Sequence, residues 1–403
     1  MKLFTIAFLL IATVATAQTQ EQLNKIKVAD NYINAIIKKV GNKRIVALGE
    51  DTHGTADFYE LRAAITKRLI KEKGFTTLIL ENPYEDMQVL QDSFYVTPLD
   101  TLMRRHLFSI YQSKQMKDFL QWFKTYAATH KKLKLAGCDD SYRELLPAMM
   151  IKEAQGLKSP ALLVQAKEFQ QRQEYSGEED MKYGLGTYVL LQQMDSVYNQ
   201  QTRRNKKFEE LLFHAKTAYV FYYRFSRKEA VSRDEIMGDR INFYANDPSQ
   251  KIIVWAHSGH IAKYAWYKKE LGLMGATVVK RFPKDYLAIS MSSGSGTYSY
   301  INNRFINDDH VFDDTLHTAT FRPLKDSSWS KLFADNVSDK FILDFSKLSP
   351  SDSAGFSANK KLRVQGYGKE SENYSEFYSV SLVRMFDMIL FLRNTRATDG
   401  LFK

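Results

Sequence analysis

RIVALGEDTHGT, residues 44–55, is the stretch that decides the predicted fold. Its apolar first half predicts a short buried strand over residues 43–48. Glu50 and His53 follow at once, between two glycines, and Thr55 is suited to cap the helix that comes next. An acid and a histidine just after a buried strand indicate either a solvated turn or one part of an active site. Partners elsewhere in the chain must decide between the two.

Three more apolar runs resemble this one, because each predicts a short strand and each ends in polar side chains. These strands are predicted at 76–80, 133–138 and 251–256. Helical periodicity fills the intervals, at 55–74, 84–130 and about 141–246. Strands that alternate with helices predict an α/β fold, with a mainly parallel central sheet flanked by helices. The last interval predicts a long helical insertion.

The two ends of the chain carry further patterns. Residues 20–40 have a helical pattern ahead of the first strand. Later strands are expected near 286–292, 340–344 and 383–392, and loops at the serine-rich 349–358 and the glycine-bearing 366–368. Residues 18–403 are therefore expected to form the α/β domain.

The first 17 residues have the features of a secretory signal peptide. Lys2 precedes an apolar run, and ATA at residues 15–17 matches a small-x-small cleavage site, so Gln18 is the expected first mature residue. We therefore expect export, into the periplasm or out of the cell. No later run approaches the roughly 20 apolar residues of a membrane span. Cys138 is the only cysteine, which excludes an intramolecular disulfide.

The formal net charge of +11 is spread along the chain without a long basic tail. Such a balance weakly favours anionic surfaces or substrates. No basic-aromatic recognition motif accompanies the charge, so nucleic-acid binding is not expected. The expected partner is a small molecule.

Polar side chains at the ends of the four predicted strands form the candidate site. In an open parallel sheet the carboxyl ends of the strands lie along one edge, where ligands bind. The chain has eight histidines, and three of them lie just past these strands. The side chains expected to meet in one pocket are Glu50, His53, Glu81, Asp139, Asp140, His257 and His260.

These residues belong to motifs that resemble the erythromycin esterase family. The first motif is GEDTHGT at 49–55, followed by Arg62, Gly74-Phe75 and Leu80-Glu81. The second, VWAHSGH at 254–260, is similar to a family motif that usually reads W-A-H-N-x-H. The closing MFDMILFLRNTR at 385–396 is similar to the family's final strand. The motifs keep the family's order and span nearly the whole mature chain.

The resemblance implies a hydrolase that opens a macrolactone ester with water and, in studied members, without a metal. It does not fix the substrate, since the family includes many members of unknown specificity. The helical interval 141–246 would then help to build the substrate cleft. Ser258 stands where the family motif commonly has asparagine, which changes a hydrogen-bonding group beside His257.

His53 is the predicted general base, because imidazole titrates near neutral pH and can take a proton from water and later return one. Glu50 is expected to orient it or to share the proton. Glu81 ends an apolar strand, where an unpaired carboxylate is costly, so it either fixes the water or a histidine or pairs with Arg62. Arg62 is expected to lean back toward the pocket, to stabilise an oxyanion or to pair with Glu81. A solvated position on the outer face of the helix is the alternative for this arginine.

His257 and His260 are expected to polarise the carbonyl, donate to the leaving oxygen or hold the substrate. Asp139 and Asp140 are assigned a structural role, as helix caps or partners of His257. The serine-rich stretch 292–296 lacks the register of a nucleophile elbow, so a serine nucleophile is not expected there.

Two alternatives to a metal-independent esterase remain open. The glutamates and histidines of the pocket are also a credible ligand set for zinc or a similar ion, which would make the protein a metal-dependent hydrolase. A periplasmic binding protein for haem or another small ligand would use the same pocket without turnover. In the metal-independent case the sequence assigns no cofactor.

Overall fold

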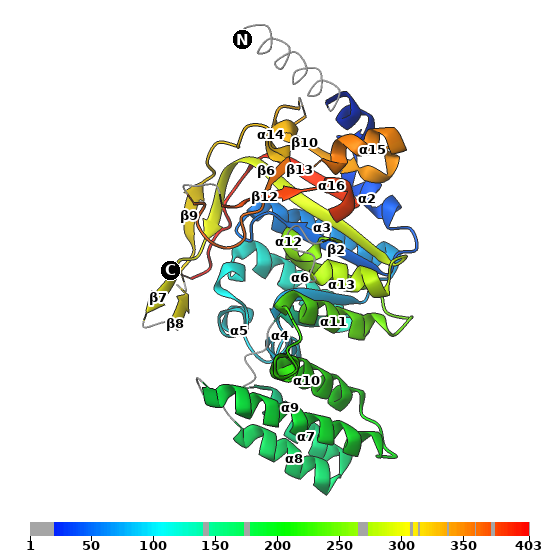
Figure 1. Cartoon of the computed structure of the whole chain (residues 1–403), viewed down its shortest axis with the longest axis vertical. Helices are drawn as coiled ribbons and strands as arrows, with labels where there is room; N and C mark the ends of the chain where they lie inside the picture. The colour runs from blue at the N-terminus through cyan, green and yellow to red at the C-terminus, as the bar shows by residue number, and fades with distance from the viewer. Residues whose placement is uncertain are drawn as a thin grey trace.

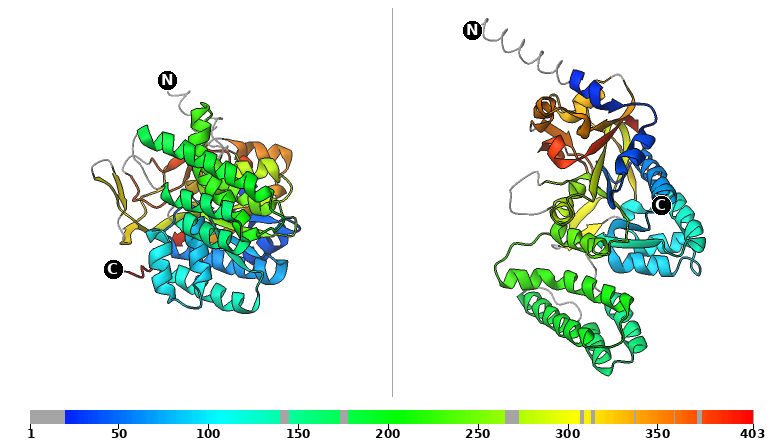
Figure 2. Two further views of the ribbon diagram at one scale, coloured as in Figure 1. Left: turned by 90° about the horizontal axis from the view of Figure 1, so that it is seen from below. Right: turned by 90° about the vertical axis from the view of Figure 1, so that its right-hand side faces the viewer.

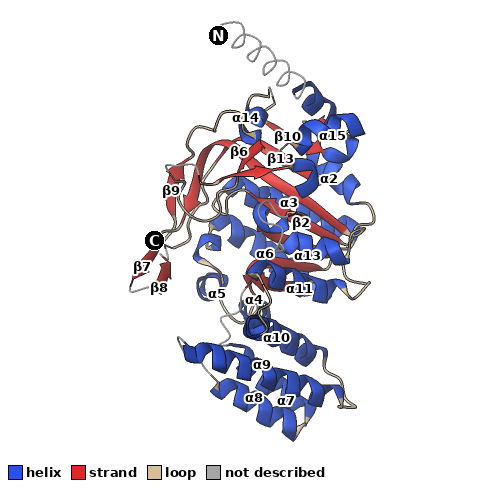
Figure 3. Cartoon of the chain, in the orientation of Figure 1, coloured by secondary structure: helices blue, strands red, loops and turns tan. Residues whose placement is uncertain are grey.

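The computed structural model describes residues 20–139, 145–172, 178–264, 273–306, 309–312, 315–336, 338–358, 360–371 and 375–402. The expected signal peptide and Asp140 lie outside these residues. The described chain is built around a sheet of nine strands with helices on both faces (Figures 1 and 3). The predicted α/β architecture is confirmed.

The sheet is mainly parallel. Its strands are β1 (Lys27–Val28), β2 (Ile45–Glu50), β3 (Thr77–Pro83), β4 (Lys134–Asp139), β5 (Ile252–His257), β6 (Tyr286–Tyr300), β9 (His317–Thr320), β10 (Lys340–Asp344) and β13 (Met388–Thr395). Their order is β1-β10-β13-β6-β2-β5-β3-β4, with β9 on the far end of β6. The pairings from β13 to β4 are parallel, and β1, β9 and β10 pair antiparallel. The carboxyl ends of β2, β3, β4 and β5 therefore share one edge.

Alternation along each strand fills a core on each face of the sheet. In β2, Val46 and Leu48 pack on one side, and Ile45 and Ala47 on the other, because successive side chains point to opposite faces. The first face is covered by α2 (Tyr32–Val40), α3 (Ala56–Lys73), α4 (Tyr84–Asp92), α5 (Leu99–His106) and α6 (Lys114–Thr129). The second is covered by α11 (Arg233–Ala245), α12 (Ser258–Ile261), α13 (Met274–Arg281), α14 (Trp329–Ala334), α15 (Pro350–Ser357) and α16 (Leu382–Met385).

The predicted helical insertion forms a separate layer below the sheet edge in Figure 1, as the right-hand view of Figure 2 also shows. It consists of α7 (Leu145–Leu157), α8 (Pro160–Gln171), α9 (Glu178–Asn199) and α10 (Lys206–Ser226). These helices share their own apolar core, which Tyr84 of α4 joins by stacking on His214 with ring centroids 3.6 Å apart. The remaining helix of this interval, α11, packs on the sheet.

Short elements complete the fold. They are the 3-10 turns η1 (Ser109–Tyr111) and η2 (Phe345–Lys347) and the strand pairs β7 (Asn303–Ile306) with β8 (Asp309–Phe312) and β11 (Lys360–Arg363) with β12 (Phe377–Val380). None of the described helices is long and apolar enough to cross a membrane.

Of three predictions about the ends of the chain, the loop is wrong and the other two are confirmed in part. The pattern at 20–40 is two helical segments separated by β1, because residues 27–28 pair with β10 at the sheet edge. The expected loop at 349–358 contains α15, because Ser349 accepts a hydrogen bond from the Asp352 N–H as an N-cap, followed by proline at the first turn. The strand expected at 383–392 begins at Met388, after α16.

Candidate active site

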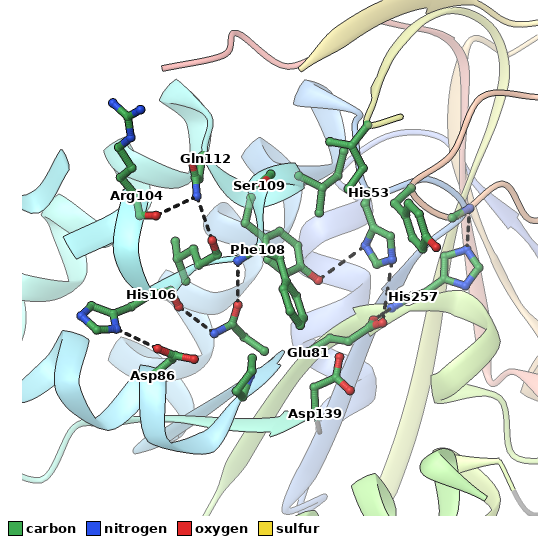
Figure 4. Close-up of a pocket in the computed structure, with 18 of the residues that line it drawn as sticks. His53, Glu81, Asp86, Arg104, His106, Phe108, Ser109, Gln112, Asp139 and His257 are labelled. Atoms are coloured by element: carbon green, nitrogen blue, oxygen red, sulfur yellow. Dashed lines mark hydrogen bonds and ion pairs between the residues drawn. The ribbon is translucent and has the colours of Figure 1, made fainter. Parts of the chain in front are cut away.

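A cavity of about 830 Å³ lies at the carboxyl ends of β2, β5, β3 and β4. His53, Glu81, Asp139, His257 and His260 line it, whereas Glu50, which was expected there too, is fully buried and does not. Figure 4 shows His53, Glu81 and His257 together at one side, and the ion-paired Asp86 and His106 at the other. A cavity of this size suits a small-molecule ligand much larger than a single reacting group.

The loop after β2 holds a histidine against a buried carboxylate. His53 Nδ1 lies 2.9 Å from Glu50 Oε1, and the glutamate is fully buried. Since a carboxylate is an acceptor, the ring donates its Nδ1–H there, and Nε2 is left with the lone pair. That nitrogen lies 3.9 Å from Glu81 Oε1, beyond hydrogen-bond distance. The arrangement leaves His53 one basic nitrogen at the cavity.

Arg62 neutralises the buried Glu50 at the carboxylate oxygen that His53 does not contact. Its guanidinium lies 2.7 Å from Glu50 Oε2, and both side chains are fully buried. The charge is sandwiched between the rings of Tyr59 and Trp255, at 4.8 and 4.7 Å from their centroids. The expected pairing of Arg62 with Glu81 is therefore wrong, and so is the solvated alternative. Arg62 sits beneath the cavity wall and does not line it.

Glu81 of β3 is the centre of a second charge cluster. Its Oε2 accepts the backbone N–H of His257 at 2.7 Å, and its Oε1 lies 3.1 Å from His260 Nε2. Burial alone would raise the pKa of this carboxyl, but the positive charge of His260, joined by that of His53 whenever His53 is protonated, outweighs it and holds the pKa well below its usual range. Glu81 is therefore a carboxylate throughout the neutral pH range.

His260 is held between two acids. Besides Glu81, Asp234 at the start of α11 lies 2.5 Å from its Nδ1. Burial by itself would lower the pKa of His260, but Glu81 and Asp234 outweigh that effect and raise the pKa to about 10. This histidine carries a fixed positive charge, with both ring nitrogens committed.

His257 has the opposite state. Burial, followed by the charges of His53 and His260, lowers the pKa of His257 to about 3, so the ring is neutral. Its Nε2 accepts the Gly366 backbone N–H at 3.1 Å. Two histidines three residues apart thus differ in charge because only one of them meets carboxylates.

Gly366 ties the two histidine loops together. Its carbonyl accepts the backbone N–H of His53 at 3.0 Å and the hydroxyl of Thr52 at 3.2 Å, while its N–H reaches His257. The residue has φ of +72°, a conformation that glycine adopts without strain. The expected loop at 366–368 is thereby part of the site.

A buried network supports the β2 loop next to this contact. Asp51 accepts the Ser293 backbone N–H at 2.8 Å and its hydroxyl at 2.9 Å. The buried guanidinium of Arg363 donates to the same hydroxyl oxygen at 2.9 Å. Burial raises the pKa of Asp51 to about 6, although Arg363 opposes the shift. The serine-rich stretch thus supports the loop, and no contact gives it the surroundings of a nucleophile.

Asp139, assigned a structural role from sequence, pairs with Arg233. The guanidinium makes two contacts with its carboxylate, at 2.6 and 2.5 Å, and lies 3.6 Å from Glu81. Both residues line the cavity, and the guanidinium of Arg233 also helps to lower the pKa of Glu81.

The chain matches a known protein family. The erythromycin esterase family model matches residues 70–395. The chain belongs to the erythromycin esterase family. Erythromycin esterase type II of Escherichia coli is 25% identical over 312 residues, which cover 66% of this chain and 73% of that protein.

Two solved structures share the fold of the present chain. A Bacillus cereus protein matches with a TM-score of 0.80 and 19% identity, over 96% of this chain and 99% of its own. A mutant of the erythromycin esterase EreC in its open conformation matches with a TM-score of 0.66 and 16% identity, over 95% of this chain and 98% of its own. At these identities the likeness shows the fold alone.

The erythromycin esterase match begins after the first motif, so Glu50, His53 and Arg62 precede it. Their place in the site rests on the geometry described above. Within the described part of the chain, no group of three or more His, Cys, Asp or Glu side chains is arranged to hold a metal ion. The donor set named from sequence is instead divided between two ion-pair clusters, one on Arg62 and one on His260.

Several site residues escaped sequence reasoning. They are Tyr111, Arg233, Asp234, Arg363 and Gly366. None follows a predicted strand of the sheet edge. Arg233 and Asp234 open α11, where Ser232 is the N-cap, and the predicted helical interval 141–246 did not mark this helix start.

Proposed function

We propose that this protein is an exported hydrolase that cleaves an ester or macrolactone bond with a water molecule activated by His53. One observation carries the proposal. His53 donates Nδ1–H to Glu50, which Arg62 neutralises, and this leaves a basic Nε2 at the cavity. Membership of the erythromycin esterase family supports hydrolysis as the class of reaction.

The proposed reaction begins with water between His53 and the substrate carbonyl. Nε2 takes one proton as the water oxygen attacks the carbonyl carbon, and the carbonyl oxygen becomes an oxyanion. The ester C–O bond then breaks, and His53 returns the proton to the leaving oxygen. An acid and an alcohol form, which remain in one molecule when the substrate is a lactone. Glu50 stabilises the imidazolium formed between these two steps.

The second cluster supplies fixed charge and shape in this proposal. His260 holds its proton between Glu81 and Asp234, so it is poorly suited to act as a base. Glu81 and the neutral His257 line the cavity opposite His53, on the other side of the proposed water. Two hydrogen bonds of the loop residue Gly366 set the distance between the two histidine loops.

A substrate screen tests this function. Macrolides, other lactones and simple esters are incubated with the wild type and with His53→Ala, and products are detected by mass as a gain of one water. The proposal expects a product with the wild type and a large loss with the variant. Binding of the panel without any product would instead favour the binding-protein alternative. Stoichiometric metal together with chelator-sensitive turnover would favour the metal-dependent one.

Export is proposed from the first 17 residues alone. Intact-mass measurement of protein recovered from outside the cytoplasm should give a chain that begins at Gln18. A full-length chain retained in the cytoplasm would contradict this part of the proposal.

A further inference from the structure

The cavity needs a hydrogen-bond donor for the oxyanion, and the expected one is not available. Donors aimed at this oxygen are commonly the largest single contribution to catalysis of acyl transfer. Arg62 was expected to fill this role, but it is fully buried and paired with Glu50. Another group at the cavity must meet the charge that develops there.

Several donors that line the cavity are already committed. His260 uses both ring nitrogens on Glu81 and Asp234, and Arg233 is paired with Asp139. The side-chain amides donate to backbone carbonyls, Asn82 to His106 and Gln112 to Leu107. These groups build the wall of the cavity.

The phenol of Tyr111 is placed differently. It lines the cavity, and its ring meets the ring of His53 edge-on, with centroids 5.7 Å apart. Its oxygen lies 3.5 Å from His53 Nδ1, a long contact with a nitrogen whose own hydrogen points to Glu50. Because Nδ1 cannot then accept, the phenol proton is available to a substrate oxygen beside the base.

The protonation state of this phenol suits a donor. Burial, then the negative charge of Glu81, raises the pKa of Tyr111 well above its usual value. The hydroxyl therefore stays protonated and neutral in the neutral pH range. A neutral donor next to His53 adds no positive charge that would oppose protonation of the base.

The segment that carries Tyr111 is fixed in place. The Asn82 side chain accepts the Phe108 backbone N–H at 3.1 Å and donates to the His106 carbonyl at 2.9 Å. Since Asn82 follows Glu81 directly in β3, the phenol is tied to the same strand end as the charge cluster. This preorganisation lets the hydroxyl stabilise charge without first moving.

We propose that the Tyr111 hydroxyl donates a hydrogen bond to the substrate carbonyl oxygen and stabilises the oxyanion formed when water attacks. The inference rests on the proposed function and assigns it a further catalytic residue. No proton is transferred from the phenol, since the water proton travels through His53 to the leaving oxygen.

Tyr111→Phe tests the assignment, because it removes the hydroxyl and keeps the ring. With an ester that the wild type cleaves, kcat should fall by about 100-fold, in line with the loss of one oxyanion donor, and KM should change by less than about threefold. The midpoint of the acidic limb of the pH–rate profile should not move. A shifted midpoint with little loss of kcat would show that Tyr111 acts by positioning His53, and would overturn the donor role.

Two matched variants sharpen the result. Tyr188→Phe removes a buried hydroxyl of α9, far from the cavity, and should leave kcat unchanged. Tyr367→Phe alters the other phenol that lines the cavity. If Tyr367→Phe causes the 100-fold loss and Tyr111→Phe does not, Tyr367 is the donor and the assignment to Tyr111 is overturned.

A binding measurement separates this inference from the proposed function. A phosphonate ester, whose anionic oxygens imitate the oxyanion, should bind Tyr111→Phe at least tenfold more weakly than wild type by calorimetry. A neutral ketone of the same shape should lose much less affinity, because a hydrogen bond to its uncharged oxygen is weaker. Equal phosphonate affinities overturn the role of Tyr111 while leaving hydrolysis standing. A wild type that neither cleaves nor binds any ester or phosphonate overturns both.

Discussion

The strands β2 and β5 are neighbours in the sheet, with Glu50 opposite His257 in the strand register. The loops that follow them nevertheless give His53 and His260 different hydrogen-bond partners. In the β2 loop, His53 has one nitrogen committed to a carboxylate that an arginine already neutralises. In the β5 loop, His260 has both nitrogens on carboxylates. A ring with one committed nitrogen can act as a base, whereas a ring with two serves as a fixed charge.

The difference also separates what each cluster contributes to stability. The β2 cluster is a fully buried ion pair whose partners are out of reach of water. The β5 cluster gains its stability from the protonated form of His260, which the folded state holds more tightly than the unfolded state. Changes in the first should therefore cost stability at any pH, and changes in the second should show a pH dependence.

The largest effect is expected from Arg62→Met. This substitution leaves Glu50 buried without a partner, and breaking a buried pair in this way costs about 3–5 kcal/mol. Urea unfolding at neutral pH measures the loss. Arg68→Met, on the exposed side of the same helix, removes a solvent-screened ion pair with Glu72 and should leave the free energy of unfolding almost unchanged. Equal costs would show that the pair with Glu50 is not the stabilising contact.

A smaller, pH-dependent effect is expected from His260→Gln. The folded pKa of about 10 lies above the unfolded value of 6.5, so the stabilisation is complete below pH 6.5 and is lost as pH rises toward 10. At about 1.4 kcal/mol per pKa unit, the loss in wild type across this window is about 2–5 kcal/mol. His260→Gln should remove this slope from the free energy of unfolding. His130→Gln, at an exposed site after α6, should retain it. A slope that survives His260→Gln assigns the titration to another group.

The smallest effect is expected from Ser290→Ala, behind the β5 loop. The hydroxyls of Ser258 and Ser290 are buried and 2.8 Å apart, so the substitution leaves Ser258 without this partner. The expected loss is about 1 kcal/mol in the free energy of unfolding, with kcat/KM unchanged. A large fall in kcat/KM at unchanged stability would mean that this pair controls the geometry of His257.

The carboxyl ends of the strands could be predicted from the sequence, because each end is marked by residues that are adjacent in the chain. Four apolar runs end in polar residues, and parallel pairing brings such ends together whatever the loops do. The long β6 was predicted only in part, since residues 293–300 are mostly serine, glycine and tyrosine and lack an apolar run. The helix α15 was missed because a serine cap and a proline also occur in loops.

The pairing within the site could not be predicted, because it depends on distances through space. The sequence left three roles open for Arg62, namely to stabilise an oxyanion, to pair with Glu81 or to be solvated, and in the structure it pairs with Glu50. Tyr111 lies in a turn between helices, where no motif marks it. The charge of His260 depends on Asp234, at a helix start that the predicted helical interval did not mark.

The central claim is that His53 is the base, and one measurement tests it directly. His53→Ala should lower kcat/KM for a cleaved ester by about 1000-fold without changing the fold, within the range for a lost general base. Added imidazole should restore part of the rate, because it can supply the missing nitrogen. A kcat/KM within about tenfold of wild type, measured before any imidazole is added, would contradict the claim.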